Sequence, residues 1–154
     1  MKKNIKSLIL SIALPLLAGG LSSLISGGGY ADYQAYIKPP LSPPGIVFPI
    51  VWSTLYTLMG ISFYLINQKG EKEKQRAVRL YYFQLFLNFI WPIIFFSLSA
   101  YTAAAFVLVL LIITVIRMII AFSKLDKRAA LLNIPYLLWL LFALYLNIAI
   151  AVLN

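Results

Sequence analysis

Five long apolar stretches dominate the pattern of hydrophobic and polar positions along this chain. They cover about residues 5–26, 46–66, 80–99, 102–123 and 131–153. Each is long enough for a helix that crosses a hydrocarbon core of roughly 30 Å, which takes about 20 apolar residues. Strands of a membrane barrel alternate apolar and polar side chains, whereas these stretches are uniformly apolar. The pattern therefore predicts an all-α membrane protein with a single domain, folded as a five-transmembrane-helix bundle.

The first stretch follows Lys2, Lys3 and Lys6, and in this respect it resembles a secretory signal peptide. It is long for the apolar region of such a peptide, and the small residues Ser26 and Gly27 make only a weak cleavage site. We therefore interpret it as a retained helix.

Composition supports the membrane class, and the distribution of charge gives an orientation. Of the 154 residues, 62% are hydrophobic and 11% are charged, against roughly 25% charged residues in a soluble domain. Eleven of the 13 Lys and Arg residues lie at the N-terminus up to Lys6, between the second and third stretches, or between the fourth and fifth. The positive-inside rule then places the N-terminus in the cytoplasm and the C-terminus outside. The net charge of +9 reflects this topology and does not call for a nucleic-acid partner.

Further charged residues lie in the second connection, in the first connection and within the fourth stretch. The connection from about 67 to 79 carries basic residues together with Glu71 and Glu73, and we predict a solvated turn facing the membrane surface. Lys38 is the only basic residue of the first connection. Arg117 lies within the fourth stretch, where it either extends to the interface or pairs with a ligand or a partner helix.

The residue types present exclude most conventional catalytic and metal chemistry. The sequence contains no Cys and no His, which removes thiolate nucleophiles, the usual general base and the commonest ligands of metals and haem iron. The four acidic residues, Asp32, Glu71, Glu73 and Asp126, all lie outside the apolar stretches. Because a proton-coupled transporter needs a carboxylate within the membrane, small-molecule transport is only a remote alternative. We predict no metal site.

The connection between the first two stretches is long and rich in proline. Pro39, Pro40, Pro43 and Pro44 are four prolines within six residues, and they force a stiff, extended path. Long ordered loops often close over a site. We predict that this loop is a lid over a cavity, with a simple spacer as the alternative.

Three of the predicted helices carry aromatic or polar side chains at helical spacing, so each presents a stripe on one face. The stripes are Phe48, Trp52 and Tyr56; Gln84, Asn88 and Trp91; and Tyr136, Trp139, Ala143 and Asn147. Amides in hydrocarbon need partners, so Gln84 and Asn88 make either interhelical hydrogen bonds or a polar patch in a ligand cavity. Trp52 fits either a cavity or an interfacial aromatic belt. A cavity with one tryptophan from each of three spans suits a flat, mostly apolar ligand such as a macrocycle or a sterol.

Small residues recur in the first and fourth stretches. Gly19, Ser23 and Gly27 repeat every four residues, and they either allow close helix approach or leave room for a ligand. Together with the alanines at 103–105, they offer an interface for a homodimer.

Several of these segments resemble sequence motifs of the translocator protein family, whose bacterial members are called tryptophan-rich sensory proteins. The first segments are KPPLSPP at 38–44 and VWSTLYTLMG at 51–60. They are followed by QLFLNFIWP at 84–92 and by the Pro, Tyr, Trp, Phe-Ala and Leu-Asn positions between 135 and 147. The resemblance spans nearly the whole chain, with the motifs in family order.

The resemblance implies a five-helix bundle in a bacterial cell membrane, usually dimeric, with a pocket beneath the first loop. It also implies non-covalent binding of porphyrins and of synthetic benzodiazepine-type or isoquinoline ligands. We take the ligand-binding candidates from the matching motifs and add Gln84 from its helical stripe. They are Tyr33, Pro43, Pro44, Phe48, Trp52, Gln84, Asn88, Trp91, Trp139, Ala143 and Leu146.

The expected function is that of a membrane sensor, carrier or scavenger of protoporphyrin IX, whose propionates would meet Lys38 or the amides of Gln84 and Asn88. The alternative is light-dependent porphyrin degradation, as associated with some family members, with Trp52 and Trp139 as the only candidate catalytic residues. Whether the protein is an enzyme stays open at this stage.

Three departures from the family pattern reduce what the resemblance implies. Leu41 and Asp32 stand where the family pattern has tryptophan, so the loop offers less aromatic surface for ligand stacking. No basic residue follows Tyr145, so the family's C-terminal sterol motif is missing, and only a loose match ending at Lys69 remains. We therefore expect weak cholesterol binding or none.

Overall fold

The computed structural model of the protein describes residues 4–27 and 29–154, and within these residues all regular secondary structure is helical. The elements are α1 (Ile5–Ile25), α2 (Tyr30–Ala35), α3 (Val47–Asn67), α4 (Glu71–Pro92), the π-helix η1 (Ile93–Ser97), α5 (Tyr101–Ser123), α6 (Lys127–Leu131) and α7 (Ile134–Leu153). Over the described residues, five helical segments are long and apolar enough to cross a membrane: α1, α3, α4 with η1, α5, and α6 with α7. The predicted five-helix architecture is confirmed.

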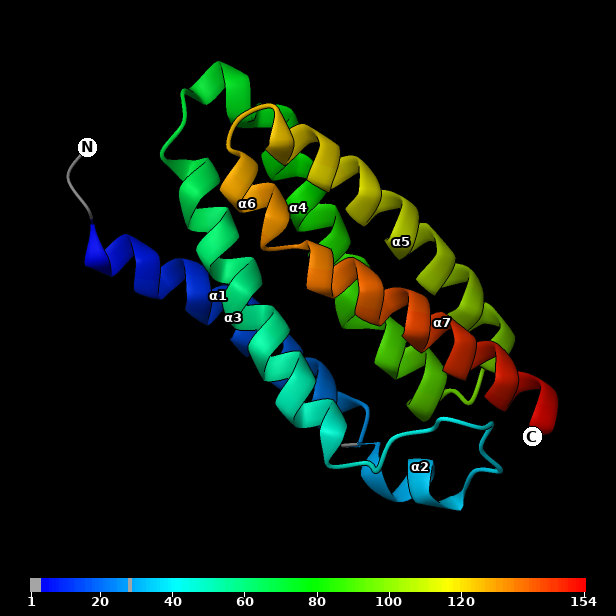
Figure 1. Ribbon diagram of the computed structural model, residues 1–154. Coiled ribbons are helices and arrows are strands. Elements are labelled where there is room, and N and C mark those ends of the chain that lie inside the picture. Colours follow the sequence, from blue (N-terminus) through cyan, green and yellow to red (C-terminus); the bar gives the residue numbers. More distant parts are fainter. Residues whose placement is uncertain (1–3, 28) are drawn as a thin grey trace.

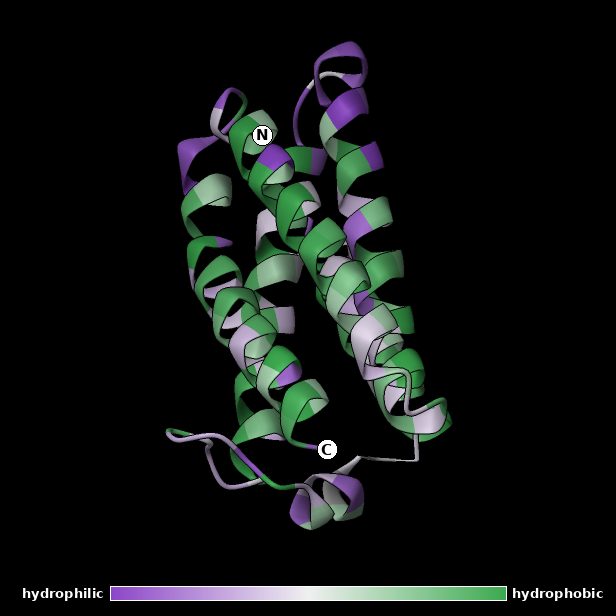
Figure 2. Cartoon of the chain, turned by 90° about the vertical axis from the view of Figure 1, so that its right-hand side faces the viewer, coloured by the Kyte–Doolittle hydropathy of each residue, from purple (hydrophilic) through white to green (hydrophobic). Residues whose placement is uncertain are grey.

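The helices form a bundle whose two ends differ in character (Figure 1). The start of α1, the α3–α4 turn and the α5–α6 turn lie at one end, which we call the charged end. The segment from 29 to 46, which we call the lid, lies at the other end with the C-terminus of α7. Hydrophilic segments gather at the ends, and the spans between them are mostly hydrophobic (Figure 2).

The largest departure from the predicted boundaries is the start of α4. The residues from Glu71 to Arg79, expected to form a solvated turn, are helical, so the connection shrinks to 68–70. Glu, Lys, Gln and Arg are good helix formers, and Glu71 and Glu73 lie in the first turn, where they favour the helix dipole. Lys74 also forms an i,i+3 ion pair with Glu71 at 2.7 Å. The apolar pattern marked only the membrane-embedded part of this helix.

The lid is partly helical and partly extended. The prolines from 39 to 44 exclude helix as predicted, but the six residues of α2 precede them. Gly29, the N-cap residue of α2, has a φ of +68°, a conformation that glycine adopts readily. The chain therefore turns sharply after α1 and crosses the end of the bundle.

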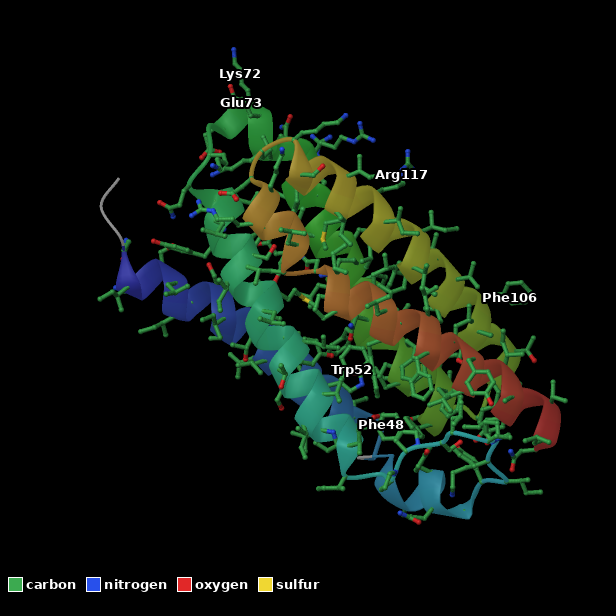
Figure 3. All side chains as sticks on the ribbon, viewed as in Figure 1. Phe48, Trp52, Lys72, Glu73, Phe106 and Arg117 are labelled. Carbon is green, nitrogen blue, oxygen red and sulfur yellow. The ribbon has the colours of Figure 1, made fainter. Side chains whose placement is uncertain are left out.

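Asp126 joins two connections at the charged end. Its carboxylate accepts hydrogen bonds from the backbone and guanidinium of Arg128, and it lies 3.4 Å from the Lys69 ammonium. Hydrogen bonding to Arg128 holds the pKa of the Asp126 carboxyl well below its usual range. The α3–α4 turn is thereby tied to the α5–α6 turn. Arg117 lies on the exposed face of α5 (Figure 3), which favours extension of its side chain towards the interface.

Close approach of backbones joins α1 to α3. A Cβ atom on Gly60 would overlap the backbone of α1 at Ser11 and Ile12, and one on Gly19 would overlap the ring of Tyr56. Such contacts are how small residues bring membrane helices together. Of the three alanines proposed for a dimer interface, Ala104 is fully buried and cannot reach a partner, whereas the alanine at 103 is exposed.

We expect Gly60→Ala to destabilise the protein, because the added methyl group would meet the α1 backbone. Overpacking of this kind costs about 1–3 kcal/mol. Thermal unfolding in detergent, followed by circular dichroism, should show a lower midpoint for this variant. Gly20→Ala is the matched control, since a Cβ atom at Gly20 has no neighbour within 4 Å. Equal midpoints for both variants would contradict the close-approach interpretation.

Candidate ligand pocket beneath the lid

A cavity of about 350 Å³ lies beneath the lid, within the range of small-molecule sites. It is bounded by α1, α3, α4 with η1, and α7, and the lid contributes Gly29, Tyr33 and Gly45 to its lining. Eight of the eleven predicted ligand-binding residues line this cavity: Tyr33, Phe48, Trp52, Asn88, Trp91, Trp139, Ala143 and Leu146. The three helical stripes expected from sequence therefore converge on one space.

The remaining three predicted residues lie outside the lining and support it. Gln84 is fully buried among the helices, where it accepts a hydrogen bond from Tyr136. The carbonyl oxygen of Pro43 accepts a hydrogen bond of 2.6 Å from the Tyr33 hydroxyl. The carbonyl oxygen of Pro44 accepts one from the first backbone N–H of α3. The two prolines thus position Tyr33 and the start of α3, and they do not line the cavity themselves.

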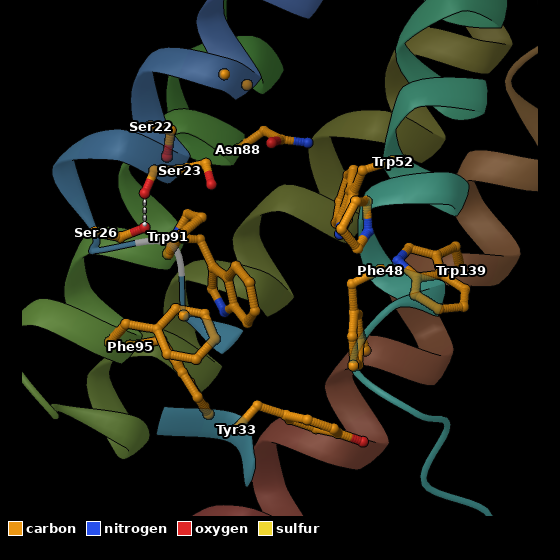
Figure 4. Close-up of a pocket in the computed structure, with 18 of the residues that line it drawn as sticks. Ser22, Ser23, Ser26, Tyr33, Phe48, Trp52, Asn88, Trp91, Phe95 and Trp139 are labelled. Carbon is orange, nitrogen blue, oxygen red and sulfur yellow. Dashed lines mark hydrogen bonds between the residues drawn. The ribbon is translucent and has the colours of Figure 1, made fainter. Parts of the chain in front are cut away.

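Aromatic rings face each other across the cavity (Figure 4). Trp91 and Phe95 lie on one side, stacked with their ring centroids 5.3 Å apart and their planes inclined at 28°. Phe48, Trp52 and Trp139 lie on the other side, with Phe48 packed edge-on against Trp139 at 5.8 Å. Trp52 therefore faces the cavity, as one of its two interpretations required.

A chain of buried hydrogen bonds closes the cavity at the end away from the lid. The Tyr56 hydroxyl donates to Asn88 Oδ1 at 2.7 Å, and Asn88 Nδ2 donates to the Tyr136 hydroxyl at 2.7 Å. Tyr136 in turn donates to Gln84 Oε1 at 2.8 Å. Both amides therefore make the interhelical bonds that one interpretation required. Asn88 also lines the cavity, so for this residue the two interpretations hold together.

A second hydrogen-bond chain fixes Trp91. Its indole N–H donates to Asn147 Oδ1 at 3.0 Å, and Asn147 Nδ2 donates to the carbonyl oxygen of Tyr101 at 2.9 Å. Asn147 thereby has the hydrogen-bond partners that an amide within an apolar span needs. Within the part of the chain that the structure describes, the Trp139 indole N–H is buried and has no partner.

Room for a ligand along α1 was one of the two interpretations of its small residues, whereas the contribution of η1 to the cavity was not predicted. Gly19, Gly20 and the hydroxyls of Ser22, Ser23 and Ser26 line the cavity along α1, so the small-residue stripe serves both close approach and open space. Phe95 and Phe96 of η1 also line it. The signal for η1 was weak: Pro92, which has no N–H, precedes this π-turn, and the Leu98 N–H bonds to the carbonyl oxygen of Ile93.

The lid is fastened to the C-terminal end of α7. The side chain of Asn154 accepts a hydrogen bond from the Ile37 N–H and donates one to the Ile37 carbonyl oxygen, both at 3.0 Å. The Tyr145 hydroxyl donates to the carbonyl oxygen of Pro40 at 2.8 Å. Burial raises the pKa of the Tyr33 hydroxyl of the lid above its usual value, so this phenol stays neutral.

Comparison with known proteins gives a consistent result. A sequence model described as the TspO/MBR family matches residues 11–153. A "Tryptophan-rich protein TspO" of Chlorobaculum tepidum is 36% identical over 100% of this chain and 99% of its own length. One of the same name from Archaeoglobus fulgidus is 36% identical over 98% and 99%. The "Translocator protein" of Bos taurus is 36% identical over 87% of this chain and 82% of its own. The resemblance inferred from the motifs is confirmed.

We expect Asn154→Ala to loosen the lid, because it removes both bonds to Ile37. Two hydrogen bonds contribute roughly 1–2 kcal/mol, or about tenfold in local opening. Hydrogen–deuterium exchange of a peptide covering residues 36–42 should therefore be faster in this variant. Val152→Ala, at an exposed neighbouring position, is the control and should exchange like the wild type. Unchanged exchange in Asn154→Ala would show that the lid is held elsewhere.

Proposed function

This chain belongs to the TspO/MBR family, and from that membership and its aromatic pocket we propose that it binds a tetrapyrrole in the membrane, with protoporphyrin IX as the ligand. Its relatives bear the names tryptophan-rich sensory protein and translocator protein, which supports a sensory or translocator role for an integral multi-pass membrane protein. Binding would serve a sensor, a carrier or a scavenger alike.

The observation that carries this proposal is the pair of facing aromatic sides in the cavity. A flat conjugated ring between Trp91 and Phe95 on one side and Trp52 and Trp139 on the other would meet π-surfaces on both faces. The chain offers neither His nor Cys as an axial ligand, which favours metal-free porphyrin over haem. The same shape suits the flat synthetic ligands of translocator proteins.

We expect Gly20→Phe to weaken protoporphyrin binding at least tenfold. Gly20 lines the cavity and has open space at its Cβ position, so a phenyl ring there would occupy the ligand's volume without disturbing the fold. The measurement is an absorption titration of protoporphyrin into protein in lipid nanodiscs. Leu24→Phe is the control, since this residue of α1 is 80% exposed and lies outside the lining. Equal affinities for the two variants would place any bound porphyrin outside this cavity.

We further propose that the charged end faces the cytoplasm of a bacterial cell and the lid faces outward, following the positive-inside rule. The chain contains no Cys, so single cysteines report topology without background. A membrane-impermeant thiol reagent applied to intact cells should label Leu41→Cys in the lid, where the side chain is 85% exposed. It should label Lys72→Cys, at the opposite end (Figure 3), only after lysis. The reverse result would invert the orientation.

A further inference from the structure

The part of the chain that the structure describes lines the pocket with uncharged residues. Among the described residues that line the cavity, the polar groups are hydroxyls, amides, indole N–H groups and backbone, with no Lys, Arg, Asp or Glu. Two of the amides, Asn88 and Asn147, are already bonded to neighbouring helices. The cavity therefore contains nothing that would balance a ligand's charge.

The basic residue closest in sequence to the lining is also committed elsewhere. Lys38, the lid's only basic residue, has three N–H groups. Its ammonium lies 3.0, 3.3 and 3.4 Å from the carbonyl oxygens of Tyr33, Gln34 and Tyr36. These contacts hold the ammonium at the end of α2, and the expected meeting of Lys38 with a ligand propionate would weaken them. The other charged residue of α2 is Asp32, which is exposed and would repel a carboxylate.

A carboxylate placed beside the buried lining residues, such as Tyr33 and Asn88, would lose hydration without gaining a counter-charge. Burying an ionised group without a partner is strongly unfavourable, whereas the neutral acid or an ester needs only ordinary hydrogen bonds. Nothing in the described lining therefore favours the ionised form of a dicarboxylate ligand over its neutral form.

From these contacts we infer that the pocket selects an uncharged tetrapyrrole: a porphyrin whose carboxyl groups are esterified, or protonated when bound. This inference rests on the proposed function and names the ligand class of the same site. It differs from the expectation that Lys38 or the pocket amides receive ionised propionates.

The test compares protoporphyrin IX with its dimethyl ester, which has the same ring and no ionisable carboxyl group. Each is titrated at pH 7.5 into protein in neutral-lipid nanodiscs, and the binding to Gly20→Phe is subtracted as membrane partitioning. The ester should bind at least as tightly as the diacid. A diacid that binds ten times more tightly than the ester would overturn the inference and leave the tetrapyrrole proposal standing. Binding of neither porphyrin would overturn both.

A cation introduced into the pocket should reverse the preference. Ser23 lines the cavity near the lid end of α1 and is exposed, so a longer side chain fits there. Ser23→Lys should shift the ratio of diacid to ester affinity at least tenfold towards the diacid, relative to Ser23→Gln, which adds length without charge. The same ratio in both variants would show that charge in the pocket does not decide which form is bound.

Discussion

Polar side chains inside a membrane must find their partners within the protein, and one buried chain of hydrogen bonds meets this need for three helices at once. Tyr56 of α3 donates to Asn88 of α4, Asn88 donates to Tyr136 of α7, and Tyr136 donates to Gln84. Each bond tolerates little displacement along a helix axis, so the chain fixes how these helices are aligned. Because its members already satisfy one another, the end of the cavity at Asn88 keeps its shape when the cavity is empty.

The first helix, α1, is held by close contact of small residues and not by the buried hydrogen-bond chain. The cavity depends on this kind of contact. Only Ser11, Pro15 and Ser22 are buried among the described residues of α1, and its contact with α3 relies on Gly60. A helix that approaches this closely through small residues carries few large side chains on its inner face. The space left beside Gly20 and Ser23 is a consequence of that contact, and it faces the rings that α3, α4 and α7 supply.

The spans and the stripes of side chains could be predicted from sequence because they depend on periodicity. The depth of single residues and the π-turn could not, because they depend on local backbone geometry and on where the helices cross. Five apolar runs were enough to predict the spans, and helical spacing was enough to bring Trp52, Asn88 and Trp139 to one cavity. Spacing could not tell that Gln84, one turn from Asn88, lies too deep to line it, because depth depends on where the helices cross. The π-turn at η1 depends on a single shift in hydrogen bonding, which apolar composition does not reveal.

The same need for internal partners explains why the pocket is neutral. No acidic residue lies within the five apolar stretches, so a Lys or Arg in the lining would stay unpaired whenever the ligand was absent. An unpaired buried charge would destabilise the empty protein by more than a ligand could later restore at low concentration. Lys38 avoids this cost by bonding to the carbonyl end of α2, and at the charged end Lys69 and Arg128 meet Asp126. A lining that carries no charged side chain among the described residues offers a ligand shape and aromatic contact, and this is the basis for proposing an uncharged ligand.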